Sequence, residues 1–202
     1  MDLVIRFAIQ ILQSLLFLRK YNIIHCDLKP ENIMLKQKNK TGIKVIDIGS
    51  GCYQEEQIYT YIQSRFYRAP EIILGIPYTC AIDIWSFACV IVELFTGYPM
   101  FPGEDEIEQM ALFMEVLGVP PNSLIEKGCR SKKFFQDFTP KIKPNKKGRL
   151  RKPNSKKLKD VVKSEDANFL DFLEKALKWN PEERLTPMEA LMHPWVVNGL
   201  PE

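Results

Sequence analysis

The chain has 202 residues, of which 46% are hydrophobic and 26% are charged, and its formal net charge is +3 at pH 7. These values are typical of a folded globular protein of one or two domains and argue against a disordered chain. No apolar run reaches the length of a membrane-spanning helix, and the first residues lack the pattern of a secretory signal. We therefore expect a protein without a membrane partner.

The numbers of cysteine and histidine residues indicate the redox compartment and restrict the kinds of metal site that the chain can form. The five cysteines form no Cys-x-x-Cys pair, and their number is odd. This pattern argues against a disulfide framework or a zinc ribbon and favours a reducing compartment. Only two histidines are present, which argues against a multi-histidine metal centre. We expect a cytoplasmic protein, with the nucleus as the alternative location.

The hydrophobic pattern predicts a mainly helical protein with one small β hairpin. Apolar residues at helical spacing predict an opening helix with Asp2 as its N-cap, ending near Tyr21. Two short β-like runs at 32–35 and 43–47 flank a polar connection, so we expect them to pair as a hairpin. The stretch 48–70 shows no period and is expected to be a long functional loop. Further helices are predicted at 81–95, 104–117, 167–179 and 187–192.

The positive charge is concentrated in one segment. Between Lys141 and Lys159 there are ten Lys or Arg residues and no acidic residue; without these ten, 18 basic residues remain against 25 acidic ones. The segment contains proline and glycine and few apolar residues, which predicts a mobile, solvated surface loop. A nucleic-acid or nuclear-import role is the alternative that such charge allows. We favour the surface loop and do not expect nucleic acid as a partner.

The densest cluster of chemically useful residues is HCDLKPEN at 25–32, and an acid follows at the end of the second β-like run. An aspartate such as Asp27 can accept a proton from a hydroxyl nucleophile. Lys29 can neutralise a phosphoryl group in transfer. Asn32 and Asp47 carry hard oxygen ligands suited to magnesium, and a hairpin would bring them to neighbouring strands. Each residue alone is more often a cap or a turn former, but together they supply the parts needed for phosphoryl transfer.

These motifs resemble those of eukaryotic protein kinases. The run at 25–32 is similar to their catalytic loop, and Asp-Ile-Gly at 47–49 is similar to their metal-binding triplet. Further marks of the family follow in order: Ala-Pro-Glu at 69–71, Asp-Ile-Trp-Ser at 83–86, Arg184 and His-Pro-Trp at 193–195. The resemblance covers almost the whole chain and implies that residues 1–202 form a kinase C-terminal lobe.

Further segments are similar to the dual-specificity tyrosine-regulated kinases (DYRK). They are His-Cys-Asp in place of the common His-Arg-Asp, YTYIQSRFYRAPE at 59–71 and LFTGYPMFPGEDE at 94–106. Those kinases belong with the proline-directed kinases and carry an insert after their helix G. The resemblance therefore implies a family-type insert at about 119–165 and protein substrates with Ser/Thr-Pro sites.

The resemblance implies a role for each matching residue of the catalytic centre. Asp27 matches the catalytic base, and Lys29 matches the lysine that contacts the γ-phosphate. Asn32 and Asp47 match the two magnesium ligands. The implied cofactors are ATP and Mg²⁺, and the positions that floor the adenine pocket are Met34 and Ile46.

Other matches imply regulation and structural support. Tyr61 matches the tyrosine that these kinases phosphorylate on themselves, and Arg65 and Arg68 are the expected partners of its phosphate. Four further residues are expected to be structural: His25 and Asp83, which hold the catalytic loop on the central helix, and the buried pair Glu71 and Arg184.

The sequence departs from the family at two residues and in one larger respect. Ala88 stands where a glycine is common in the central helix, which is harmless because alanine is the better helix former. Ile48 replaces the usual phenylalanine of the metal-binding triplet, and its apolar side chain can keep the packing role. No Gly-x-Gly-x-x-Gly motif is present, and the residues before His25 supply no strand lysine with a paired helix glutamate. We therefore expect the N-terminal lobe to be absent, with the chain a fragment or a truncated gene model of a longer parent kinase and inactive by itself.

The leading hypothesis is ATP-dependent phosphorylation of protein Ser/Thr, and of its own Tyr61, by the parent dual-specificity kinase. One alternative is a non-catalytic docking or binding module that uses helix G and the basic insert. The retained Asp27, Asn32 and Asp47 argue against a parent that evolved as a pseudokinase. The other alternative is a small-molecule phosphotransferase, against which the segment 59–71 argues because it resembles a platform for peptide substrates.

Overall fold

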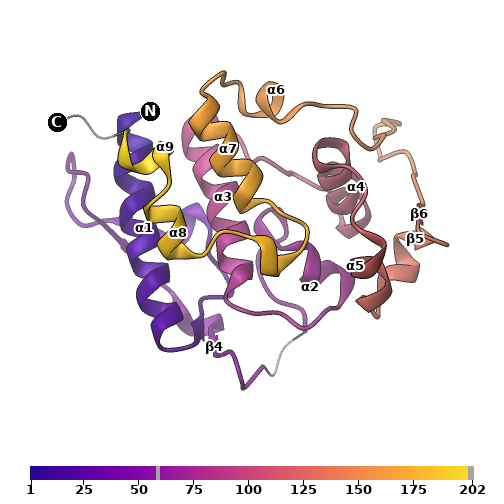
Figure 1. The fold of residues 1–202 in the computed structure, drawn as a ribbon, viewed down its shortest axis with the longest axis horizontal. Helices are drawn as coiled ribbons and strands as arrows, with labels where there is room; N and C mark the ends of the chain where they lie inside the picture. The colour runs from indigo at the N-terminus through magenta and orange to yellow at the C-terminus, as the bar shows by residue number, and fades with distance from the viewer. Residues whose placement is uncertain (58–59, 200–202) are drawn as a thin grey trace.

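The structure, a computed structural model, describes residues 1–57 and 60–199. Helices dominate it and surround one long central helix (Figure 1). The helices are α1 (Asp2–Lys20), α2 (Pro70–Leu74), α3 (Ala81–Thr96), α4 (Glu106–Leu117), α5 (Asn122–Lys127), α6 (Leu158–Val162), α7 (Ala167–Ala176), α8 (Pro187–Leu191) and α9 (Pro194–Val197). The strands are β1 (Ile23–Ile24), β2 (Ile33–Leu35), β3 (Ile43–Val45), β4 (Cys52–Tyr53), β5 (Phe135–Gln136) and β6 (Thr139–Pro140).

Helix α1 confirms the opening helix predicted from the apolar spacing. One face is buried against α3, α8 and β3, and it carries Val4, Ile5, Ala8, Ile11, Leu12, Leu15 and Leu18. The prediction of Asp2 as N-cap was wrong, because Met1 occupies that position and Asp2 lies in the first turn. Its carboxylate there still favours the helix, since the N-terminal end of a helix carries partial positive charge.

Helix α3 forms the centre of the hydrophobic core. Its residues from Ala81 to Val92 are all buried, as expected of a helix that is apolar on every side. Trp85 lies at the middle, with the rings of Phe113 at 4.8 Å and Phe101 at 6.1 Å. Burial of each such aromatic side chain stabilises the fold by about 2–3 kcal/mol. The helix ends at Gly97, whose φ of 81° is the left-handed conformation that favours glycine.

The β structure is more extensive than predicted. Strands β2 and β3 pair antiparallel with Ile33 opposite Val45, which confirms the predicted hairpin. The expectation of one β element was wrong, because β1 also pairs with β4 and β5 with β6 in the described part of the chain. The β1–β4 pair sets Ile24 opposite Cys52 and so holds the start of the long loop beside the loop 25–32. Strands of two residues are too short for an alternating pattern to reveal them.

The basic segment lies on α4 and does not extend into solvent as a free loop. Arg151 donates to Glu108 Oε1 at 2.8 Å and to Glu115 Oε2 at 3.0 Å, so one guanidinium joins two buried carboxylates of α4. Lys156 adds an ion pair to Glu115 at 3.2 Å, and Asn145 donates to Glu108 at 2.7 Å. The prediction of a free, solvated loop was therefore wrong, because the basic side chains pair with acids of α4 that lie far away in the sequence.

Within the residues that the structure describes, no helix combines the length and the apolar character needed to cross a bilayer.

Candidate active site

Hydrogen bonds to the first turn of α3 hold the loop 25–32 in place. The backbone N–H of His25 donates to Asp83 Oδ2 at 2.8 Å, and the N–H of Cys26 donates to Oδ1 at 3.2 Å. Burial raises the pKa of Asp83 to about 6 even though these hydrogen bonds favour the ionised form. Cys26 has a φ of 66°, a strained conformation for a non-glycine residue, and the two bonds to Asp83 hold it there.

Asp27 stands at the centre of a hydrogen-bond network. Its Oδ2 accepts from Lys29 Nζ at 2.7 Å, and its Oδ1 accepts from Ser64 Oγ at 2.7 Å and Ser64 N at 3.1 Å. Burial raises the pKa of the Asp27 carboxyl, but the bonds from Lys29 and Ser64 outweigh it and hold the pKa below its usual value. Asp27 is therefore ionised at neutral pH, as a proton acceptor must be.

Asn32 and Asp47 lie at the ends of paired strands. Ile46 N donates to Asn32 O at 2.9 Å, which places Asp47 one residue beyond the partner of Asn32. Asn32 donates its amide N–H to Asp27 O at 2.8 Å, so its amide oxygen points away from that contact. Asp47 has a φ of 64°, and a Cβ at Gly49 would lie 3.2 Å from Asp47 Oδ1. The glycine leaves room beside a carboxylate whose oxygens, with the Asn32 amide oxygen, suit a hard divalent cation.

His25 joins the two loops that carry these groups. Its Nε2 lies 3.0 Å from Ile46 O, and its Nδ1 accepts from Asp27 N at 3.3 Å. With both ring nitrogens engaged, Nε2 carries the proton and donates to the carbonyl. The side chain is fully buried. The imidazole thus fixes the position of Asp47 relative to Asp27 without facing solvent.

Met34 and Ile46 lie on the hairpin and are partly open to solvent. Met34 is 52% exposed and Ile46 is 37% exposed. Leu35 and Ile48, close to them in the sequence, are also exposed, and exposed Phe17 of α1 lines one hollow with Val45 and Ile48. This apolar surface is suited to contact a flat, apolar group or another structural element.

The segment 60–71, which resembles the activation segment of protein kinases and is called so below, places Tyr61 close to only one of its two expected arginine partners. The Arg68 guanidinium lies 4.1 Å from the centre of the Tyr61 ring, and it donates to Ile62 O at 2.9 Å and Gln63 O at 2.7 Å. Arg65 points elsewhere and donates to Glu104 O at 2.7 Å. The structure therefore brings Tyr61 to Arg68 and not to Arg65 while the tyrosine is unmodified. Tyr59, the alternative tyrosine of this segment, lies outside the described residues.

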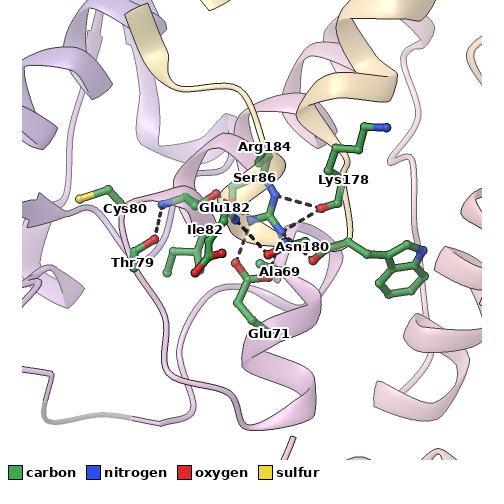
Figure 2. Close-up of polar contacts among 12 residues, drawn as sticks. Ala69, Glu71, Thr79, Cys80, Ile82, Ser86, Lys178, Asn180, Glu182 and Arg184 are labelled. Atoms are coloured by element: carbon green, nitrogen blue, oxygen red, sulfur yellow. Dashed lines mark hydrogen bonds and ion pairs between the residues drawn. The ribbon is translucent and has the colours of Figure 1, made fainter. Parts of the chain in front are cut away.

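Glu71 and Arg184 form a buried ion pair across a long stretch of sequence. Arg184 Nη1 donates to Glu71 Oε1 at 2.8 Å and Nη2 to Oε2 at 3.1 Å, and neither side chain is exposed. Arg184 also donates to the carbonyls of Ala81 at 2.9 Å and Lys178 at 3.1 Å. Figure 2 shows its guanidinium between Glu71 and Lys178. Such complete pairing is what a buried charge requires.

Two residues of this site were missed in the sequence. Ser64 contacts Asp27 directly, and Gln63 accepts from Ala69 N at 2.8 Å and donates to Ser86 Oγ at 2.8 Å. Gln63 is buried and has a φ of 67°, so it braces the segment from inside. The one indication of their role in the sequence is their position between Tyr61 and the Ala-Pro-Glu motif. Gln63 and Ser64, with Tyr61 and Arg68, line a hollow of about 500 Å³ beside Asp27.

The comparison with known proteins identifies the class to which this fold and site belong. The sequence matches the protein kinase domain family over residues 2–196, so the chain belongs to the protein kinase family. That family uses ATP and a divalent metal and acts on proteins.

Several of the similar proteins are named dual specificity tyrosine-phosphorylation-regulated kinases. The chain is 54% identical over 194 residues to kinase 2 of that name from Drosophila melanogaster, covering 96% of this chain and 27% of that protein. It is 52% identical over 197 residues to kinase 4 from Homo sapiens, covering 97% and 38%. It is 51% identical over 186 residues to the DYRK-family kinase pom1 from Schizosaccharomyces pombe, covering 91% and 17%. The chain thus spans 17–38% of the length of these relatives.

Proposed function

We propose that the chain is the C-terminal lobe of a DYRK-type kinase, whose parent protein transfers the γ-phosphate of ATP to Ser or Thr of proteins and to its own Tyr61. The observation that carries the proposal is the pairing of Asp27 with both Lys29 and Ser64. A carboxylate held ionised between a lysine and an activation-segment hydroxyl is arranged to receive a substrate hydroxyl. The relatives' names support the dual specificity.

Asp27 acts first by orientation. Its pKa is held low, so it is a weak base, and it aligns the substrate hydroxyl before it accepts the proton late in the transfer. Lys29 neutralises charge on the moving phosphoryl group while it holds Asp27 Oδ2. Phosphoryl transfer through a loose transition state depends mainly on such positioning.

Asn32 and Asp47 would hold the magnesium ion, which when bound neutralises charge on the nucleotide phosphates. Met34 and Ile46 would lie under the adenine ring, because their exposed apolar side chains are on the hairpin that leads into both metal ligands. His25 and Asp83 keep these groups in place through the bonds described above.

A chimera tests the proposal. This chain would replace the 197 matched residues of the human relative, which supplies the remaining kinase parts. We expect the chimera to phosphorylate a protein substrate and Asp27→Asn to lower kcat by at least about a thousandfold with the KM for ATP little changed. Glu31→Gln, a neighbouring acid outside the network, is the matched control. A folded chimera that binds ATP and has no Asp27-dependent activity would falsify the proposal.

The chain of 202 residues by itself is proposed to be inactive. Its sequence contains no glycine-rich phosphate loop, and the described sheets are two-stranded. We expect weak binding of Mg-ATP and no turnover, measured by calorimetry and by radiolabel transfer. Turnover by this chain that disappears in Asp27→Asn would contradict this part of the proposal and leave the kinase assignment intact.

Substrate choice and maturation are proposed from the same resemblance. Acidic residues prevail outside the insert, which favours basic residues before the target, and the family match favours proline after it. After autophosphorylation, the Tyr61 phosphate would meet the guanidinium of Arg68, which already lies against the ring, and Arg65 would turn from Glu104 toward it. Peptide arrays and phosphotyrosine mapping of the chimera test both points.

A further inference from the structure

The largest hollow described outside the catalytic loop lies between α4, α7 and the segment that leads into α6. Its volume is about 600 Å³. In Figure 1 the segment before α6 runs from the side of α4 towards α7. None of the residues that line the hollow belongs to the catalytic loop or the activation segment. The hollow is therefore separate from the site proposed above.

The wall of the hollow is fixed by backbone hydrogen bonds. Asn154 N donates to Met114 O at 2.9 Å, and Lys156 N donates to Glu115 O at 3.0 Å. These carbonyls belong to the last turn of α4, where helix carbonyls have no partner within the helix. The two bonds engage these carbonyls, that of Met114 in addition to its bond from Gly118 N, and hold the segment against α4. The hollow is therefore a defined feature of the fold.

The floor of the hollow is apolar. Leu117 closes the end of α4, while Leu170, Leu177 and Trp179 come from α7 and the residues after it. Leu177 is 1% exposed and Trp179 is 8% exposed, so their side chains are fixed by packing. A floor of this kind can receive one or two apolar side chains of a partner.

The rim of the hollow is basic. It carries four lysines, and Glu174 is the single acid among the lining residues. Lys156 and Lys159 are engaged by Glu115 and Glu165. The other two, Lys157 and Lys178, are exposed and form no ion pair with any residue that the structure describes.

We propose that this hollow docks an acidic segment of another protein, which places an apolar side chain on the floor and carboxylates beside Lys157 and Lys178. The occupant follows from charge complementarity: two unpaired cations flank an apolar floor and only one acid opposes them. The inference is independent of the proposed kinase activity, because it concerns binding at residues that the catalytic network does not include.

The test measures binding of a fluorescent peptide in which glutamates flank a pair of leucines. Fluorescence anisotropy with the 202-residue chain gives the Kd. We expect the double variant Lys157→Glu/Lys178→Glu to weaken binding by at least about tenfold. The matched control is Lys147→Glu/Lys152→Glu, which reverses two exposed lysines of the same segment that do not line the hollow. The control changes the net charge equally and should leave the Kd within about twofold.

Three results would overturn the proposal. The first is absence of binding to the wild-type chain, and the second is equal weakening by both double variants, which would indicate attraction by net charge alone. The third is equal binding of a peptide of glutamates without leucines, which would remove the role of the floor. Vesicles with phosphatidylserine serve as a further probe, and binding of vesicles but not of the peptide, lost in Lys157→Glu/Lys178→Glu, would assign the hollow to lipid instead. Quenching of Trp179 fluorescence by the peptide would support contact with the floor.

Discussion

Asp27 owes its low pKa to donors from two separate parts of the chain. Lys29 is its near neighbour in sequence, whereas Ser64 lies 37 residues away on the activation segment. The protonation state of Asp27 therefore depends on the position of that segment. A displacement of Ser64 would remove both hydrogen bonds to Asp27 Oδ1 and leave Lys29 alone to oppose the effect of burial, so the pKa of Asp27 would rise.

Ser64→Ala in the chimera removes the hydroxyl donor but keeps the backbone N–H. We expect kcat to fall by roughly tenfold, because Asp27 is less well oriented. The pKa of Asp27 should rise, so the acid limb of the pH profile of kcat should move to higher pH. Ser64→Thr keeps the hydroxyl and should restore both values. A fall in kcat with an unmoved acid limb would show that Ser64 does not tune the base.

The raised pKa of Asp83 leads us to expect that the stability of the fold depends on pH. Its pKa is raised in the folded state to about 6, so the stability it contributes is present at low pH and is lost as pH rises through 6. Between pH 5 and pH 7 this loss amounts to about 1 kcal/mol. Asp27, Glu106 and Glu108 have lowered pKa values and act oppositely, but only as pH falls toward and below 4.

Urea unfolding of the chain at a series of pH values measures this effect. We expect wild type to be more stable at pH 5 than at pH 7 and Asp83→Asn to be less stable at both but without that slope, since Asn cannot accept from both His25 N and Cys26 N. The exposed Asp160→Asn is the control and should keep the wild-type slope. An unchanged slope in Asp83→Asn would contradict the assignment.

At the scale of elements, α4 and the basic segment form one unit. Glu108 and Glu115 stand two helical turns apart on one face of α4, and both are buried. A helix with acids on its buried face is unstable unless cations cover them. Arg151 meets that need because its planar fork reaches both carboxylates.

Arg151→Ala leaves two buried carboxylates with fewer partners. We expect the free energy of unfolding to fall by about 2–4 kcal/mol and trypsin to cleave the segment 141–159 faster. Lys152→Ala removes the next cation, which is exposed, and should change neither. Limited proteolysis followed by mass spectrometry locates the cuts. Equal protection of the segment in wild type and Arg151→Ala would show that the guanidinium does not hold it.

The elements differ in how far the sequence predicts them. Helices α1 and α3 and the β2–β3 hairpin follow from local periodicity, and the structure confirms them. Contacts between residues far apart in the sequence cannot be predicted in this way, because the local pattern around a residue does not indicate its distant partner. Arg151 and Glu108 are 43 residues apart, and each looks like a solvated charge in the sequence. For the same reason no local pattern indicates the contact of Ser64 with Asp27, whereas Asp27, Lys29 and Asn32 form a local cluster in the sequence whose roles remain a proposal.

At the scale of the whole molecule, Arg184 joins regions that are far apart in the chain. It contacts α2 through Glu71, the start of α3 through Ala81 and the turn after α7 through Lys178 and Trp179. Figure 2 shows these bonds converging on one guanidinium. The pair therefore holds the activation segment's end to the C-terminal helices.

Glu71→Gln leaves the charge of Arg184 buried with a weaker partner. We expect a loss of about 3–5 kcal/mol in the free energy of unfolding, measured by urea denaturation. The double variant Glu71→Met/Arg184→Met removes both charges and should recover part of the loss. Glu165→Gln breaks the exposed pair with Lys159 and should leave the urea midpoint unchanged. A single variant as stable as wild type would contradict the proposed structural role.

The separation of 113 residues between Glu71 and Arg184 also has a consequence for biosynthesis. Glu71 leaves the ribosome long before Arg184 does, and until then its carboxylate has no guanidinium to meet. Burial of the carboxylate in that interval would be costly, so α2 cannot settle into its final place early. Arg184 follows η5 (Pro181–Glu183), so the ribosome must synthesise η5 and Arg184 before the end of the activation segment can pack against the C-terminal helices. The nascent chain is therefore expected to leave α2 undocked until late in its synthesis.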